Sequence, residues 1–215
     1  MTKLTFSKLA SSAALATAVS LFAPGFAQSS LAQVPQVSDA ERETIVGVMN
    51  GHRREAIDIS DNISLEPVTW SPRLAQVAQY WVNQFAEENG FPVDDPPSIV
   101  TNEVGNELDQ TSHTFWWGSA GRFTVADMVN GWVDTANTYE GGAAAVLSEL
   151  PSLSREDISR ADGPFGAARA YAIVVSPEWT HVGCGKTVQG GRDVLYCLYG
   201  DHSFEQEKRN RQRAS

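Results

Sequence analysis

The fold is decided near the end of the chain, by Trp179-Thr-His-Val-Gly-Cys-Gly-Lys-Thr-Val-Gln-Gly-Gly-Arg-Asp-Val-Leu-Tyr-Cys-Leu-Tyr199. Two apolar, β-branched runs flank Gly190-Gly191, which is typical of a two-residue hairpin turn because both central residues need φ > 0. In the register that this turn sets, Cys184 lies opposite Cys197 in a non-hydrogen-bonded pair. Such a pair brings the two Cα atoms about 4.5 Å apart, within disulfide reach. The segment predicts a β-hairpin with a cross-strand disulfide, and two buried free thiols are the alternative.

An export signal is predicted at the amino terminus. Lys3 and Lys8 precede an apolar run over residues 9–23, which is too short to span a bilayer comfortably. Small residues at Gly25-Phe-Ala27 and Ser30-Leu-Ala32 offer two cleavage sites. We therefore expect residues 1–32 to be a signal peptide and the mature protein to be secreted, either extracellular or periplasmic. An uncleaved membrane anchor is the alternative, and no later run is long and apolar enough to form a transmembrane segment.

The remainder is expected to form one domain over residues 40–202, after a linker at 33–39 and before a flexible, basic tail at 203–215. The full chain has a net charge of −10, and the predicted signal contains two lysines and no acidic residue. The mature protein therefore carries a charge of about −12. A surface this acidic argues against nucleic acid and against anionic lipid headgroups as partners.

Three longer helices are predicted from their first residues. Ser38-Asp-Ala-Glu41 and Thr124–Asp127 are capping boxes, and Ser71-Pro72 places an N-cap residue before a proline at the first helical position. The second of these helices is expected to end at Gly90. Its apolar residues recur at helical spacing and form one stripe, Leu74, Val77, Ala78, Trp81, Val82 and Phe85. Two shorter helical pieces are expected at 143–150 and after Ser154.

An irregular region is expected from Phe91 to Arg122. A loop this long within a compact domain is usually functional or disordered, and its aromatic residues argue against simple disorder. The triplet Phe115-Trp116-Trp117 is therefore interpreted as lining an apolar groove or contacting a partner. The alternative is that the triplet covers the core.

One further strand is expected at Arg169–Val175, directly before the hairpin. Helices come first and strands later in this order of elements, which favours an α+β fold with a small antiparallel sheet covered by helices.

Several motifs together resemble the CAP superfamily, which comprises cysteine-rich secretory proteins, antigen 5 and plant pathogenesis-related proteins and is also called the SCP domain. The most specific are Val68-Thr-Trp-Ser-Pro-Arg-Leu-Ala75, Val182-Gly-Cys-Gly185 and Cys197-Leu-Tyr199. The resemblance covers about residues 40 to 201. It implies a three-layer α-β-α sandwich, in agreement with the order of elements above.

Most of the metal-binding residues of the family are missing from this chain. The resemblance implies two histidines and two glutamates, but Ala170 and Phe91-Pro92 occupy the histidine places and Thr135 one glutamate place. The other glutamate corresponds to Glu103 or Glu107. The four histidines of the chain also show no paired ligand spacing. We therefore predict no metal and no cofactor.

The leading hypothesis is a secreted, non-catalytic domain that binds an apolar small molecule, a sterol or fatty acid as the resemblance implies, or a protein partner. Enzyme activity is not excluded, and the alternative is a protease-like hydrolase with a cleft around Glu103, Glu107 and His113. A purely structural envelope protein is a third possibility. The candidate ligand-binding residues are Glu103, Glu107, His113, Trp116, Trp117 and Trp132.

Overall fold

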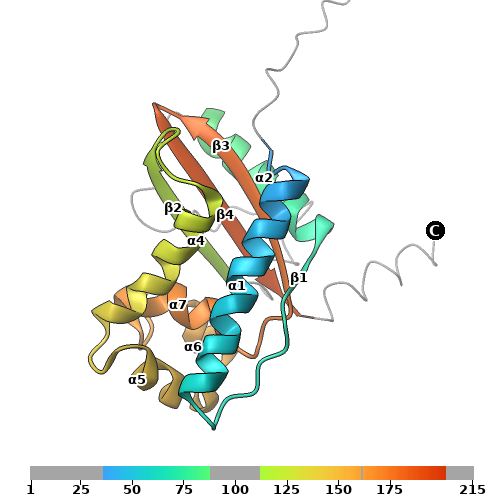
Figure 1. Cartoon of the computed structure of the whole chain (residues 1–215). Helices are drawn as coiled ribbons and strands as arrows, with labels where there is room; N and C mark the ends of the chain where they lie inside the picture. The colour runs from blue at the N-terminus through green and yellow to red at the C-terminus, as the bar shows by residue number, and fades with distance from the viewer. Residues whose placement is uncertain (1–35, 88–111, 161, 202–215) are drawn as a thin grey trace, which may run out of the picture. The chain divides into compact units, whose positions relative to one another are not determined.

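The computed structural model describes residues 36–87, 112–160 and 162–201 (Figure 1). The strands are β1 (Thr69–Trp70), β2 (Ser112–Ser119), β3 (His181–Gln189) and β4 (Arg192–Gly200). The helices are α1 (Asp39–Ile59), α2 (Pro72–Glu87), α4 (Val125–Asp134), α5 (Gly142–Glu149), α6 (Arg155–Ser159) and α7 (Arg169–Val174). Short 3₁₀ turns lie at η1 (Thr135–Thr138), η2 (Leu150–Ser152) and η3 (Gly166–Ala168).

The predicted hairpin and its register are confirmed. Strands β3 and β4 pair antiparallel across Gly190 and Gly191, whose φ angles are 54° and 75°. Cys184 pairs with Cys197, their Cα atoms lie 4.0 Å apart, and the two residues form a disulfide. The hairpin is the centre of a four-stranded sheet of order β1-β3-β4-β2. The sheet is mixed rather than purely antiparallel, because the two-residue strand β1 runs parallel to β3.

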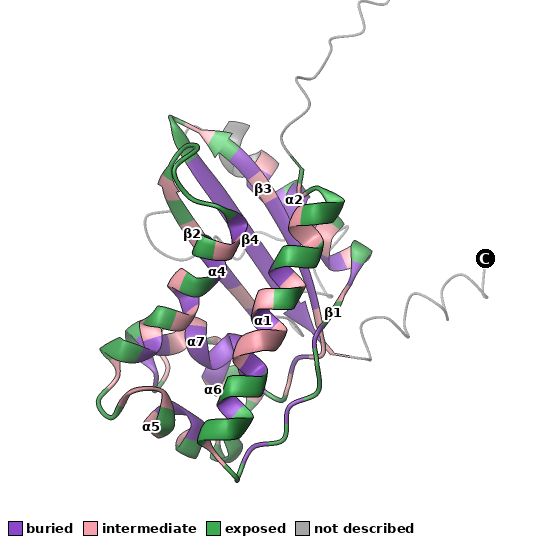
Figure 2. Ribbon diagram, viewed as in Figure 1, coloured by how far each residue is buried: buried purple, intermediate pink, exposed green. Residues whose placement is uncertain are grey.

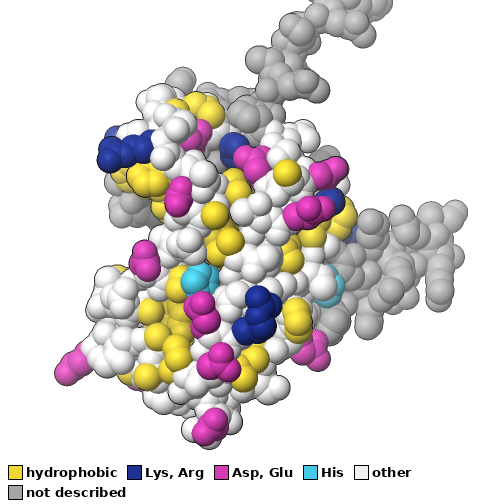
Figure 3. All heavy atoms as spheres, in the orientation of Figure 1, with side chains coloured by type: hydrophobic (Ala, Val, Ile, Leu, Met, Phe, Trp, Pro, Cys, Tyr) yellow, Lys and Arg dark blue, Asp and Glu magenta, His cyan; other side chains and the backbone are white. Residues whose placement is uncertain are grey.

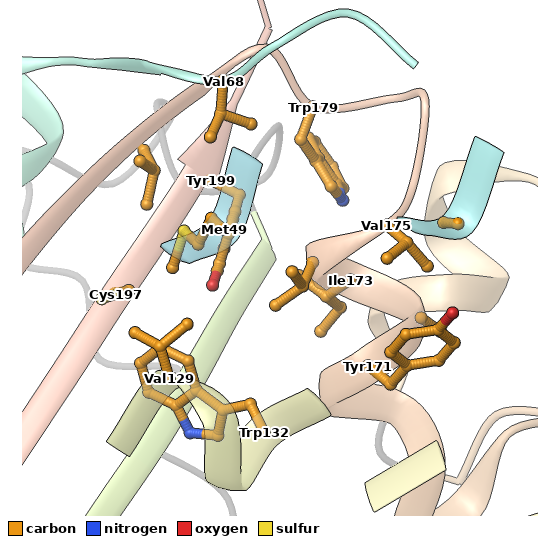
Figure 4. Close-up of a cluster of buried hydrophobic side chains, with 14 of the residues drawn as sticks. Met49, Val68, Val129, Trp132, Tyr171, Ile173, Val175, Trp179, Cys197 and Tyr199 are labelled. Carbon is orange, nitrogen blue, oxygen red and sulfur yellow. The ribbon is translucent and has the colours of Figure 1, made fainter. Parts of the chain in front are cut away.

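Helices cover both faces of this sheet, which confirms the predicted α+β class and its three layers (Figure 1). Helix α2 packs on β3 and β4 over one face, and its apolar stripe meets the side chains of Val194, Tyr196 and Leu198. The other face carries the larger core, to which α1, α4 and α7 contribute. Figure 2 shows β4 almost entirely buried between these layers, whereas β3 is buried at residues 182–185 and 187. In Figure 4, Met49, Val129, Trp132 and Ile173 gather around Tyr199.

The two glycines of β3 allow α2 to approach the sheet closely. A Cβ atom placed on Gly183 would lie 2.1 Å from the backbone nitrogen of Ala75, and one on Gly185 would lie 2.5 Å from the carbonyl carbon of Ala78. Both clashes are with helix backbone, which cannot move aside as a flexible side chain can. Cys184 lies between the two glycines and belongs to the core on the opposite face. In the Val-Gly-Cys-Gly motif, the two glycines therefore set how closely α2 approaches the sheet, and the cysteine crosslinks β3 to β4 on the opposite face.

Local capping fixes where the helices begin, as the sequence predicts. Capping boxes start α1 at Ser38, α4 at Thr124 and α6 at Ser154. At α2, the Ser71 hydroxyl accepts a hydrogen bond of 3.2 Å from the backbone N–H of Leu74, and Pro72 occupies the first helical position. These bonds pair N–H groups that have no partner within the helix itself.

A buried arginine ties α1 to the chain segment that leads into the hairpin. Arg53 is 2% exposed. Its guanidinium donates to the carbonyl oxygens of Val174, Ser176 and Trp179 at 2.8, 2.9 and 3.3 Å, and also to that of Glu66 at 2.9 Å. Burial lowers the pKa of Arg53 to about 10, so the group stays charged at neutral pH. One side chain thus donates to four backbone carbonyl oxygens, and three of these hydrogen bonds are buried.

Two sequence predictions of secondary structure are wrong. Residues 112–119 form strand β2, not an irregular loop, and pair with β4 along their whole length. Residues 169–174 form helix α7, not a strand. The run Tyr171–Val175 is entirely buried, so its apolar pattern has no periodicity that separates a short buried helix from a strand.

Replacing Gly183 with alanine is expected to destabilise the protein by at least about 3 kcal/mol, because the new methyl group meets helix backbone rather than a movable side chain. Urea denaturation measures the change. Gly47→Ala is the matched control, since Gly47 lies within α1 with nothing within 4 Å of the added Cβ. That control is expected to stabilise the protein by about 0.5–1 kcal/mol. Equal stability of the two variants would contradict the close-packing argument.

Loss of the disulfide is expected to cost about 2–3 kcal/mol, the range for so short a closed loop. Denaturation midpoints of the oxidised protein, the reduced protein and a Cys184→Ala/Cys197→Ala variant measure this cost. Intact mass with and without a thiol-alkylating reagent establishes the redox state first. Two alkylated cysteines in protein purified without reductant would contradict the crosslink.

Candidate functional site

The predicted aromatic cluster is divided between the two faces of β2. Side chains alternate along a strand, and Trp116 pairs across from Leu195 while Trp117 pairs across from Val194. Leu195 belongs to the core beneath α1 and α4, whereas Val194 belongs to the core beneath α2. The two tryptophans therefore do not share one binding surface, contrary to the expectation from the sequence.

Trp116 lies on the α4 side of the sheet and is partly buried. Its ring meets that of Phe123 edge-on at 4.8 Å between centroids, and its indole nitrogen lies 3.1 Å from where a Cβ on Gly131 would be. Phe123 itself is 38% exposed. Trp116 therefore supports an aromatic side chain that reaches the surface.

Trp117 lies on the opposite face and is 48% exposed. The guanidinium of Arg192 is stacked over its ring at 4.1 Å from the centroid. Trp132 differs from both, because it is 2% exposed and its indole N–H donates to the carbonyl oxygen of Phe115 at 3.0 Å. Trp132 thus has a structural contact in the core, and its predicted role in ligand binding remains a prediction.

His113 is held as a neutral ring at the start of β2. Its ring stacks on that of Tyr196 with centroids 5.6 Å apart, and the Nη2 atom of Arg169 lies 3.4 Å from its Nε2 atom. Burial, together with the positive charge of Arg169, lowers the pKa of His113 to about 3. An imidazole with so low a pKa is a poor general base at neutral pH. Glu103 and Glu107, its predicted partners, lie outside the described residues.

The family's metal-binding positions within the described residues carry no ligand groups. Thr135 and Ala170, which the resemblance places at a glutamate and a histidine, come close together. The Thr135 hydroxyl accepts a hydrogen bond from the backbone N–H of Tyr171 at 3.2 Å and donates one to the carbonyl oxygen of Trp132 at 2.6 Å. Across the described residues, no three His, Cys, Asp or Glu side chains gather in a way that could hold a metal ion.

Sequence reasoning missed one polar cluster, which links α1 to α4. The Nδ1 atom of His52 lies 2.8 Å from a carboxylate oxygen of Glu55, and its Nε2 atom lies 2.8 Å from Oδ1 of Asn130. The spacing of His52 and Glu55 on one helix was visible in the sequence. The contact with Asn130, which is 78 residues from His52 in the chain, depends on how α1 and α4 pack together.

Sequence reasoning also missed two surface grooves that border the first turns of α1. The α1–α4 groove has a volume of about 510 Å³ and is lined by Ala40, Glu41, Thr44, Phe123, Val125, Met128 and Lys186, among others. The α1–α2 groove has a volume of about 440 Å³ and lies between the start of α1, Trp70 and one side of α2. Figure 3 looks onto the face that carries α1 and α4, where hydrophobic side chains are exposed between scattered charged ones.

The α1–α4 groove combines apolar walls with one ion pair. The Lys186 ammonium group on β3 pairs with the Glu41 carboxylate on α1. Burial alone would raise the pKa of Glu41, but its hydrogen bonds with Lys186 and Ser38 hold that pKa below its usual value. The groove thus presents Phe123, supported by Trp116, at one side and a partly buried cation at another.

These features define a small α-β-α sandwich with a disulfide in its central sheet. The chain belongs to the CAP family, described as the cysteine-rich secretory protein family, whose model matches residues 46–199. The family resemblance read from the sequence is therefore confirmed.

Individual relatives are distant. Venom allergen 5 of Vespa magnifica is 26% identical over 141 residues, which cover 64% of this chain and 52% of that protein. This chain thus spans about half the length of that curated relative. Among solved structures, Na-ASP-1 is 16% identical with a TM-score of 0.49, over 76% of this chain and 37% of that one. Schistosoma mansoni venom allergen-like protein 4 is 15% identical with a TM-score of 0.48, over 76% and 88% of the two chains.

The protein is expected to lose stability as acid protonates the unfolded chain at His113. The folded-state pKa of about 3 lies below the ordinary value of 6.5, so the unfolded state binds the proton first. The contribution of His113 to the free energy of unfolding is therefore complete above pH 6.5. It is lost between pH 6.5 and 3, by at most about 1.4 kcal/mol per pH unit. Denaturation of the wild type and of His113→Gln at each pH isolates this slope from that of the carboxylates. Identical slopes in both proteins would show that His113 titrates normally in the folded state.

Proposed function

We propose that this protein is a secreted, non-catalytic CAP domain that binds an apolar small molecule in the α1–α4 groove, a fatty acid in preference to a sterol. The observation that carries the proposal is the pairing of an exposed aromatic wall, Phe123, with the Lys186 cation in one groove. An acyl chain would cover the first and its carboxylate would meet the second.

The geometry of the wall supports an apolar ligand. Phe123 remains 38% exposed although its ring is packed against Trp116, and Val125 and Met128 lie beside it in the groove. A single exposed aromatic side chain would need no explanation, but one that lines a groove together with other apolar side chains is typical of a site for an apolar ligand. Of the predicted aromatic triplet, Trp116 therefore contributes to this site, because its ring supports Phe123.

The polar end of the groove favours a carboxylate over a hydroxyl group. Lys186 is paired with Glu41, but its ammonium group has three N–H donors and could donate to a ligand carboxylate while keeping that pair. A sterol hydroxyl would accept from the same group in a hydrogen bond to a neutral acceptor, which is weaker than one to a carboxylate.

A binding role without catalysis is supported by the state of the other candidate residues. His113 is neutral with a very low pKa, and the hydroxyl of Thr135 is engaged with backbone groups. The comparisons give no support to the alternative of a hydrolase. Export remains part of the proposal. Among the described residues, no helix has the length and apolar content needed to cross a bilayer.

The Phe123→Ala variant is expected to bind a fluorescent fatty acid, cis-parinaric acid, several-fold more weakly than the wild type. Full burial of a phenylalanine side chain contributes about 1.5–3 kcal/mol, but Phe123 is 38% exposed, so a ligand can cover only that fraction, and about 1.4 kcal/mol corresponds to a factor of ten in the dissociation constant. Titration followed by probe fluorescence measures the effect. A fluorescent sterol, dehydroergosterol, run in parallel separates the two ligand classes.

Trp117→Ala is the matched control, because Trp117 is also an exposed aromatic residue but lies on the opposite face of the sheet. Its affinity for the fatty acid is expected to equal that of the wild type. No binding by the wild-type protein, or equal weakening in both variants, would contradict the assignment of the ligand to this groove.

A further inference from the structure

The α1–α2 groove is a second and separate surface feature, since it shares no lining residue with the α1–α4 groove. One wall is a single row along α2, formed by Pro72, Gln76, Gln79, Tyr80 and Asn83. These positions are spaced i, i+4, i+7, i+8 and i+11, so they lie on one side of the helix over roughly 16 Å. The groove is therefore elongated and long enough for several linked rings of a chain molecule.

Half of the residues that line this groove carry neutral amides or aromatic rings. Tyr80 is 40% exposed, and the partly buried Trp70 also lines the groove. Gln76 and Asn83 contribute amide groups, each of which offers two N–H donors and a carbonyl acceptor. The charged groups at the rim, Asp39 and Arg42, form an ion pair of 3.2 Å with each other.

This composition defines the chemistry of a fitting ligand. Paired rim charges leave no net charge to attract an ion, and burial of amide groups under an acyl chain would cost free energy because their hydrogen bonds with water would be lost. A neutral molecule rich in hydroxyl groups would replace those bonds. Flat apolar faces on the same molecule would stack on Tyr80 and Trp70. Pyranose rings combine both properties.

One amide in the row organises the groove and closes the sheet edge beneath it. The Gln79 side chain accepts from the backbone N–H of Lys186 at 3.0 Å and donates to the carbonyl oxygen of Lys186 at 3.0 Å. It also donates to Oδ1 of Asn83 at 2.9 Å. The bond from Gln79 fixes which end of the Asn83 amide is the acceptor, so the amide nitrogen of Asn83 is oriented in advance.

The same bonds argue against an extended peptide as the ligand. A peptide that adds to a sheet edge needs the backbone N–H and carbonyl groups of that edge. At Lys186 on β3 both groups are already occupied by Gln79. The edge is therefore closed at this point to strand addition.

We propose that the α1–α2 groove binds a neutral glycan, with Tyr80 and Trp70 as stacking faces and with Gln76 and Asn83 as hydrogen-bonding residues. Gln79 acts as a positioning residue through Asn83. This site is independent of the proposed fatty-acid groove, and either could exist without the other.

Isothermal titration calorimetry with three tetrasaccharides tests the proposal: β-1,4-linked N-acetylglucosamine, β-1,4-linked glucose and α-1,4-linked glucose. We expect at least one probe to bind the wild-type protein. The Tyr80→Ala and Gln76→Ala variants should each bind that probe at least tenfold more weakly. Tyr80→Phe should retain most of the affinity, because it keeps the stacking face. Both positions are exposed, so the variants are expected to fold, and circular dichroism checks this.

Trp117 is an exposed aromatic residue that does not line the groove, so Trp117→Ala is the control and should bind the glycan as the wild type does. Cis-parinaric acid binding by Tyr80→Ala should also be unchanged, which separates failure of this proposal from failure of the fatty-acid proposal. Absence of binding by all three probes at millimolar concentration would overturn the glycan assignment. Unchanged affinity in both Tyr80→Ala and Gln76→Ala would do the same. A neutral hydrophilic peptide that binds where the sugars do not would reassign the groove to peptides.

Discussion

The structure depends on the backbone contact between α2 and β3. Gly183 and Gly185 have no side chain, so the helix lies against the strand where any Cβ atom would clash with helix backbone. Because side chains alternate along a strand, the residue between them, Cys184, faces the opposite core and forms the disulfide there. A single four-residue motif thereby determines how closely one helical layer approaches and how the sheet is crosslinked on the other side.

The position of α1 decides what the surface can bind, because both grooves border its first turns. Arg53 holds the later part of α1 against the segment that enters the hairpin, and the Glu41–Lys186 ion pair holds its first turn against β3. The capping box at Ser38 uses the same Glu41 carboxylate. One side chain therefore starts the helix, docks it on the sheet and forms part of the α1–α4 groove.

The family scaffold is present in this chain, and two described positions carry small side chains where the resemblance implies metal ligands. Thr135 and Ala170 stand close together where the family resemblance implies a carboxylate and an imidazole, and Thr135 is engaged with backbone groups. His113 packs as a neutral ring against Tyr196. The grooves on either side of α1 present apolar and amide-rich surfaces of different chemistry.

The sequence by itself determined the features that depend on near neighbours in the chain: the hairpin register, the disulfide, the capping boxes and the family. Turn and cap geometry involves only a few consecutive residues, so local patterns predict it. Strand β2 and helix α7 escaped prediction because each is stabilised by partners distant in sequence. Only the tertiary structure could place residues 112–119 in a strand, whose alternation puts Trp116 and Trp117 on opposite faces. It also brings Phe123 and Lys186 into one groove, which follows from how the helices pack on the sheet.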